Sequence, residues 1–178
     1  MSSTFEKLGQ RTIWQGHVVE VRVERFRHED GAEVERDNMH HPGAVAIVAV
    51  DDEHVWLVRQ PREICGVPDL LELPAGKLDV AGEPPLETAK RELAEEIGKA
   101  ATDWEPLTGF FTSCGFSDER LELFHASGLS DVPQPEVDEE ERIEIVPWPL
   151  ARLDDAIAAC QDAKTLIGLL LLQRRLRG

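Results

Sequence analysis

The chain has 178 residues, 42% of them hydrophobic and 30% charged, which indicates one folded, soluble domain rather than a disordered chain. Its net charge of −16 argues against a partner as anionic as nucleic acid or a lipid surface. Three scattered cysteines fit neither a disulfide framework nor a zinc site, and neither a signal peptide nor a membrane span is recognisable, so the sequence predicts a cytoplasmic protein.

The first half of the chain is dominated by strand-like patterns in which apolar and polar residues alternate. In chain order we expect one or two strands in residues 12–26, a turn at 28–31, a further strand over 32–41, two buried strands within 43–60, and a Pro- and Gly-rich loop over 61–82 interrupted by a short apolar run at 70–73.

The second half begins with a predicted helix from about Pro85 to Ile97. Pro84 and Pro85 suit its first turn and Gly98 suits its end. The elements expected after it are strands at 104–111, 120–125 and 143–148, a surface loop between 125 and 142, and helices at 150–160 and 163–177. This mixture, without an internal repeat or a dividing linker, indicates an α/β or α+β sandwich.

The predicted helix carries an unusual distribution of charge. Its apolar residues, Leu86, Ala89, Leu93 and Ile97, form one stripe, while Glu92 and Glu96 are neighbours on the shoulder of that stripe. Like charges at the edge of a core repel each other, and a divalent cation reverses the sign of that interaction.

A plain alternative is that this segment is merely a solvated charged helix, because Glu, Lys and Arg are good helix formers. The shoulder position of the carboxylates, and the Gly-bounded loop ahead of the helix, favour a metal and phosphate site instead.

Residues 76–98, GKLDVAGEPPLETAKRELAEEIG, resemble the Nudix box, G-x5-E-x7-R-E-U-x-E-E-x-G-U, where U is apolar. The positions that match with the right spacing are Glu83, Arg91, Glu92, Leu93, Glu95, Glu96 and Gly98. Two departures are one extra residue between Gly76 and Glu83, and Lys99 at the final apolar position. Neither touches the metal-binding positions.

The resemblance implies a Nudix-type α/β/α sandwich with a mixed central sheet over residues 41–178, preceded by an antiparallel strand region over residues 1–40. It implies that Glu92, Glu96 and the carbonyl of Ala75 hold Mg²⁺, with Mn²⁺ as an alternative. Glu95 would support a second ion or orient water, and Glu83 with Arg91 would brace the loop.

The resemblance is closest to the ADP-ribose pyrophosphatase branch, through HPGAVAIVAV (41–50), VRQPRE (58–63), LLELPAGKLD (70–79), GFSDERLELF (115–124) and DAKTLIGLLLL (162–172). It implies that Glu139 is the general base, with Glu140 nearly as good a candidate, and that Glu141 is a further metal ligand. An ordinary acidic loop is the alternative for each of these three.

The same resemblance implies a set of substrate contacts. Arg62 would bind phosphate or the terminal ribose, and Arg36 is a weaker candidate that fits a surface charge equally well. Glu72 would lie near the floor of the site, Glu119 near the metals, and Gly115 in the substrate loop; ordinary strand-end and loop-capping roles are the alternatives for the two glutamates.

Cys114 stands where the branch usually has proline, which puts the substrate in question but not the chemistry. The expected reaction is hydrolysis of the pyrophosphate bond of ADP-ribose or a related nucleoside diphosphate sugar. The alternatives are another nucleotide sugar such as GDP-mannose, and a non-catalytic domain that senses a nucleotide sugar. Relatives in this branch are dimers whose N-terminal strands reach the partner subunit, so a homodimer is expected.

Overall fold

The chain folds into two compact units, and the computed structural model describes residues 4–134 and 142–178. The first unit comprises Met1–Gly43 and Phe111–Arg120, and the second comprises Ala44–Phe110 and Leu121–Gly178. Within the described residues, no helix is long and apolar enough to cross a membrane.

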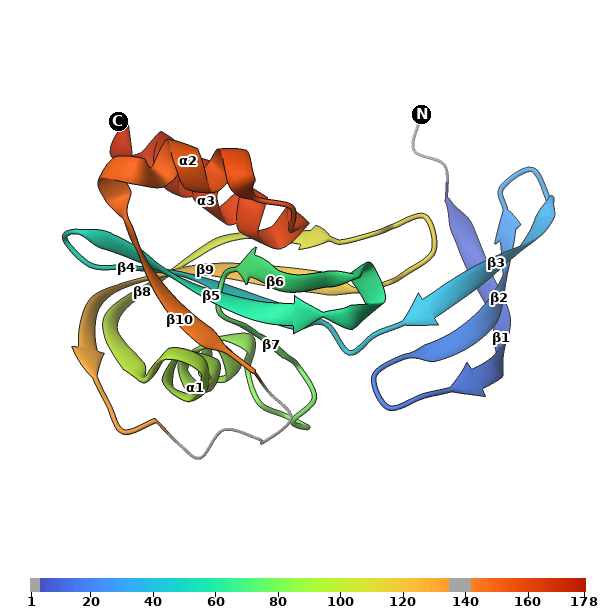
Figure 1. Cartoon of the computed structure of the whole chain (residues 1–178). Helices are drawn as coiled ribbons and strands as arrows, with labels where there is room; N and C mark the ends of the chain where they lie inside the picture. Colours follow the sequence, from blue (N-terminus) through green and yellow to red (C-terminus); the bar gives the residue numbers. More distant parts are fainter. Residues whose placement is uncertain (1–3, 135–141) are drawn as a thin grey trace. The chain divides into compact units, whose positions relative to one another are not determined.

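The first unit contains an antiparallel sheet in the order β1-β2-β3 (Figure 1). Its strands are β1 (Phe5–Gln15), β2 (Glu20–His28) and β3 (Glu33–His40). The alternating segment 12–26 is divided between two strands because the chain reverses after Gly16, whose amide donates to the Val19 carbonyl at 2.9 Å. β1 also begins well before residue 12, since Phe5 pairs with His28 although its surroundings do not alternate.

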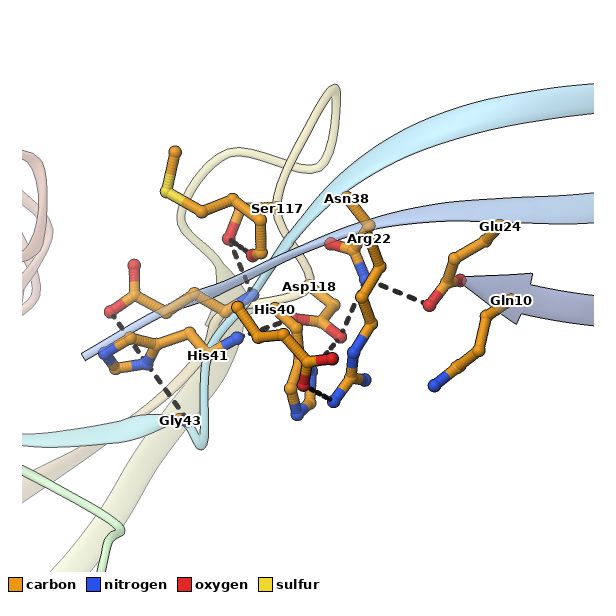
Figure 2. A network of polar contacts seen from close by, with 12 residues as sticks. Gln10, Arg22, Glu24, Asn38, His40, His41, Gly43, Ser117 and Asp118 are labelled. Carbon is orange, nitrogen blue, oxygen red and sulfur yellow. Dashed lines mark hydrogen bonds and ion pairs between the residues drawn. The ribbon is translucent and has the colours of Figure 1, made fainter. Parts of the chain in front are cut away.

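A polar network joins the loop 112–119 to the end of β3 within the first unit (Figure 2). The Asp118 carboxylate accepts hydrogen bonds from Asn38 Nδ2 at 3.1 Å and from the His41 amide at 3.0 Å, and it lies 2.6 Å from Nδ1 of His40. Burial would raise the pKa of Asp118, but the bonds from His40, Asn38 and the His41 amide outweigh burial and lower it. The His40 ring and the His41 backbone amide therefore hold Asp118 in place.

We expect Asp118→Asn to destabilise the protein near neutral pH and not in acid. A carboxyl whose pKa is lowered by folding stabilises the native state above its unfolded pKa of about 4, and that contribution is lost as the pH falls through the folded pKa. Because the side chain is 39% exposed, solvent screening limits the effect to about 1 kcal/mol. Urea unfolding of both proteins at pH 7 and at a pH well below 4, beneath the folded pKa of Asp118, measures it. An equal difference at both pH values would show that the charge of Asp118 is not the cause.

The second unit is built on a mixed sheet, seven-stranded over the described residues, in the order β10-β5-β4-β9-β8, with β6 paired to β5 and β7 paired to β4. β4 is parallel to β9 and antiparallel to β5 and β7. The strands are β4 (Ala44–Val50), β5 (His54–Arg62), β6 (Val67–Glu72), β7 (Ala75–Lys77), β8 (Lys99–Phe111), β9 (Arg120–Asp131) and β10 (Glu144–Pro149).

Helices cover both faces of this sheet (Figure 1). The helix α1 (Pro85–Ile97) packs on one face, against Val45, Ile47 and Ala49 of β4. The helices α2 (Leu153–Ala159) and α3 (Ala163–Leu176) pack on the other, against Ala46 and Val48. Successive residues of a strand point to opposite faces, so β4 contributes to both cores. The α/β sandwich with a mixed sheet that the sequence predicts is confirmed.

The helix α1 has the bounds predicted from the sequence. Pro85 occupies its first turn, and Gly98 ends it in the left-handed conformation, at φ 62° and ψ 33°. Ala89, Leu93 and Ile97 are buried, as the apolar stripe predicts. The same rotation places Glu96 at the edge of the core, where it is 8% exposed.

Three sequence expectations are corrected by the structure. The predicted loop 125–142 is strand in its first part, because β9 runs on to Asp131 beside β4 and β8. The predicted loop 61–82 contains β6, β7 and a 3₁₀ turn at Glu63–Cys65. In both places pairing with a neighbouring strand overrides a local sequence rich in Gly, Ser and Pro. A 3₁₀ turn at Leu150–Arg152 also delays the start of α2 to Leu153.

Candidate active site

Two carboxylates of α1 meet the backbone of β7. Glu96 accepts a hydrogen bond from the Ala75 amide at 3.1 Å. Glu92 lies one turn earlier on the helix, and its side chain is 14% exposed. Its carboxyl group fills the space beside the Cα of Gly76, the next residue of β7. The Ala75–Gly76 backbone and these two carboxylates are therefore in direct contact.

The close approach of Glu92 requires glycine at position 76. A Cβ built there would stand 1.9 Å from the Glu92 carboxyl carbon and 2.1 Å from one of its oxygens, far inside van der Waals contact. Any other residue would push the carboxylate away from β7. The glycine at the start of the acidic motif thus determines where a carboxylate 16 residues later can lie.

Arg91 offsets part of the negative charge of three carboxylates, Glu83, Glu92 and Glu95. Its Nη1 lies 2.8 Å from Glu95 and 2.9 Å from Glu92, and its Nη2 lies 3.3 Å from Glu83. Burial would lower the pKa of Arg91, but these carboxylates raise it. Glu83 also accepts a hydrogen bond from the Thr88 hydroxyl at 2.8 Å, and Thr88 and Arg91 together lower the pKa of Glu83. Arg91 thus ties the loop before α1 to the helix.

A second cation stands at the end of β5 and reaches Glu72, the last residue of the antiparallel strand β6. Arg62 donates from Nε and Nη2 to the two oxygens of Glu72, at 2.6 and 2.9 Å, so the pair is bidentate. The Glu72 side chain is 1% exposed. The hydrogen bond to Glu72 raises the pKa of Arg62 most, and Glu96 also raises it. Arg62 is therefore close enough to the α1 carboxylate of Glu96 to interact with it electrostatically.

The structure adds residues of α3 that sequence reasoning did not single out. Lys164 donates a hydrogen bond to Glu72, and its Nζ lies 2.9 Å from Asp162. Thr165 accepts a hydrogen bond from the Leu73 amide at 2.8 Å. An Asp just before a predicted helix is a recognisable N-cap signal. The contact of Lys164 with a residue 92 positions earlier leaves no such local signal.

The remaining predicted residues fall in two groups. Arg36, Gly115 and Glu119 belong to the first unit: Arg36 is exposed on β3, Gly115 is exposed in the loop after β8, and Glu119 accepts a hydrogen bond from Thr112 at 2.6 Å. Their part in the site stays a prediction. Glu139, Glu140 and Glu141 lie outside the described residues, so their roles also stay predictions.

The donors that converge on β7 fit a hard divalent cation, which prefers carboxylate and carbonyl oxygens. Within residues 4–134 and 142–178, no three His, Cys, Asp or Glu side chains stand close enough to hold a metal by themselves. The two carboxylates of Glu92 and Glu96 would therefore be joined by the Ala75 carbonyl, by substrate oxygens or by side chains outside those ranges.

Comparison with known proteins agrees with this geometry. The NUDIX domain model matches residues 39–175. An ADP-ribose pyrophosphatase of Mycobacterium tuberculosis is 44% identical over 83% of this chain and 72% of its own length. An ADP-ribose pyrophosphatase of Bacillus subtilis is 38% identical over 97% of this chain and 95% of its own. The crystal structure of an ADP compounds hydrolase, 25% identical, superposes with a TM-score of 0.82 over 98% of this chain and 95% of that one. With an acidic helix set against a Gly-containing strand and a family match over most of its length, the chain belongs to the Nudix hydrolase family.

Proposed function

We propose that this protein hydrolyses the pyrophosphate bond of ADP-ribose, releasing a nucleoside monophosphate and a sugar phosphate. The observation that carries the proposal is the convergence of Glu92 and Glu96 on the Ala75–Gly76 backbone, with Arg62 close enough to interact with Glu96. Two relatives that this chain matches over most of its length are ADP-ribose pyrophosphatases.

Nudix hydrolases typically depend on a divalent metal, and we propose Mg²⁺ here, with Mn²⁺ as an alternative. Glu92, Glu96 and the Ala75 carbonyl would hold it, and Glu141 would be a further ligand. When bound, such an ion polarises the pyrophosphate oxygens and lowers the pKa of a coordinated water. The Ala75 amide, which donates to Glu96, fixes that carboxylate before any metal arrives.

The other catalytic roles are assigned to carboxylates around this centre. Glu139 is our candidate for the base that takes a proton from the attacking water, and Glu140 is the alternative. Glu95 would orient that water. Its side chain is 40% exposed and is paired with Arg91, so it is held in place while remaining open to solvent.

Substrate contacts are proposed for five residues. Arg62 suits the pyrophosphate because a guanidinium binds phosphate oxygens through a rigid fork of N–H donors. Glu72 would act through Arg62, since its own oxygens are occupied and buried. Arg36, Gly115 and Glu119 are also proposed as substrate contacts, on the family resemblance alone.

Hydrolysis of a panel of nucleotides with and without Mg²⁺ tests the function. The panel comprises ADP-ribose, GDP-mannose, UDP-glucose, diadenosine polyphosphates and nucleoside triphosphates. We expect turnover of ADP-ribose to dominate and to stop when EDTA removes the metal. A preference for GDP-mannose would replace the substrate and keep the chemistry. Binding without turnover of any compound would favour the sensing domain instead.

We further propose that the protein is a homodimer assembled through its N-terminal strands. Large apolar side chains are exposed on the first unit, including Phe5, Ile13 and Trp14, each more than half exposed. We propose that a partner subunit covers these side chains. Light scattering should therefore give about twice the monomer mass, and Trp14→Ser should shift the population toward monomer. A monomer at high concentration would contradict the proposal.

We also propose that the protein is cytoplasmic and that it does not bind nucleic acid. Cys65, Cys114 and Cys160 are free thiols, as a reducing cytoplasm would leave them. A net charge of −16 opposes binding to nucleic acid.

A further inference from the structure

A buried ion cluster lies behind Arg62. The Glu72 carboxylate, 1% exposed, receives the two bonds from Arg62 and a third from Lys164. Lys164 is also largely buried, at 15% exposed, and it pairs with Asp162. Two cations and two carboxylates thus form a chain of alternating charge. Removing one member from such a chain leaves an uncompensated charge next to the others.

The cluster is anchored to the backbone that leads to the metal site. Asp162 caps α3 by accepting from the Thr165 amide at 3.0 Å and from the Thr165 hydroxyl at 2.6 Å. Thr165 in turn accepts from the amide of Leu73, between Glu72 and the Ala75–Gly76 strand. The first turn of α3 therefore fixes the position of Glu72 from two directions, through a side chain and through the backbone.

One edge of the Arg62 guanidinium, the edge that carries Nη1, is open to a ligand. Glu72 occupies Nε and Nη2, whereas Nη1 has no hydrogen-bond partner among the described residues. The Arg62 side chain is 44% exposed, although the carboxylate it binds is buried. A guanidinium held on one edge and open on the other can meet a phosphate without losing further side-chain entropy.

We infer that Lys164 is a positioning residue for substrate binding, which rests on the proposed pyrophosphatase function. Lys164 supplies the second positive partner of Glu72, keeps that carboxylate turned toward Arg62, and so presets the free edge of Arg62 for the pyrophosphate. The negative charge of the substrate is present before and during the reaction. Loss of this contact should therefore weaken binding more than it slows turnover.

Lys164→Met tests this role through a split between binding and turnover. We expect the KM for ADP-ribose to rise about tenfold while kcat stays within about threefold. The equilibrium Kd for ADP-ribose in EDTA, measured by calorimetry, should also rise about tenfold, since Arg62 needs no metal. Lys164→Arg restores the cation and should return both values to within about threefold of wild type.

Lys99→Met is a matched control. Lys99 is also 15% exposed and paired with a carboxylate, Asp131, but it lies at the start of β8, and its partner at the end of β9. This variant should leave KM and Kd unchanged. If Lys164→Met fails to fold, Lys164→Gln, which keeps a hydrogen-bond donor and removes the charge, carries the same expectation. Unchanged KM and Kd in the neutral variant, or no recovery in Lys164→Arg, would overturn the inference.

The kinetic measurement with metal and the binding measurement in EDTA together separate this inference from the proposed function. If wild-type protein binds ADP-ribose in EDTA but never hydrolyses it with metal, the proposed function fails and the Kd still decides the role of Lys164. If wild-type protein hydrolyses ADP-ribose and Lys164→Met matches it in both KM and Kd, only the inference fails.

Discussion

Glu96→Gln is expected to lower kcat/KM for ADP-ribose at least about 1,000-fold, about 4 kcal/mol of transition-state stabilisation, while the fold is kept. Glutamine has the same shape, and its amide oxygen can still accept from the Ala75 amide at 3.1 Å. It carries no charge, so the proposed divalent ion would lose one of the two helix carboxylates that meet at β7. Steady-state kinetics and thermal unfolding of the same samples measure both parts of this expectation.

Glu87→Gln is the control for this variant. Glu87 lies on the same helix, is 53% exposed and pairs with Lys90, so its charge faces solvent. We expect wild-type kinetics from it. Full activity in Glu96→Gln would remove Glu96 from the metal site. A loss of activity together with a collapsed melting transition would instead mean that Glu96 acts through the fold.

The position of α1 and its carboxylates could be predicted from the sequence because every signal there is local. Pro85 and Gly98 mark the ends of the helix, and a period of 3.6 residues links its buried and charged positions. Given the buried Leu93, the placement of Glu92 and Glu96 beside the stripe follows from geometry alone. The family resemblance already groups Ala75 with these carboxylates, and the structure adds that Ala75 lies in the strand β7.

The support of the site could not be predicted in the same way, because it depends on distant contacts. Lys164 and Glu72 are 92 residues apart, and nothing near either residue reveals the pairing. The extension of β9 to Asp131 has the same origin, since a sequence such as ASGLSD becomes strand only through its neighbours in the sheet. Periodicity identifies an element and the side it buries, but not its partner.

Gly76→Ala is expected to lower kcat about 100-fold while stability hardly changes. The added Cβ would overlap the Glu92 carboxyl group, at 1.9 Å from its carbon. That group is the end of a flexible side chain, so it can swing away at little cost, but it then leaves the Ala75–Gly76 backbone. Displacing a catalytic group by about 1 Å costs about 100-fold in rate.

The expected stability change is small for a separate reason. Gly76 lies outside the positive-φ region, so alanine fits its backbone, and replacing glycine restricts the unfolded chain, which offsets strain by about 0.4–1 kcal/mol. Gly9→Ala is the matched control, because Gly9 also lies in a strand and has no atom within 4 Å of an added Cβ. Steady-state kinetics of both variants test the expected loss in kcat, and urea unfolding tests the expected small change in stability. Wild-type turnover in Gly76→Ala would mean that Glu92 need not touch β7 during the reaction, and the metal site would then have to be rebuilt around Glu96 and residues beyond α1.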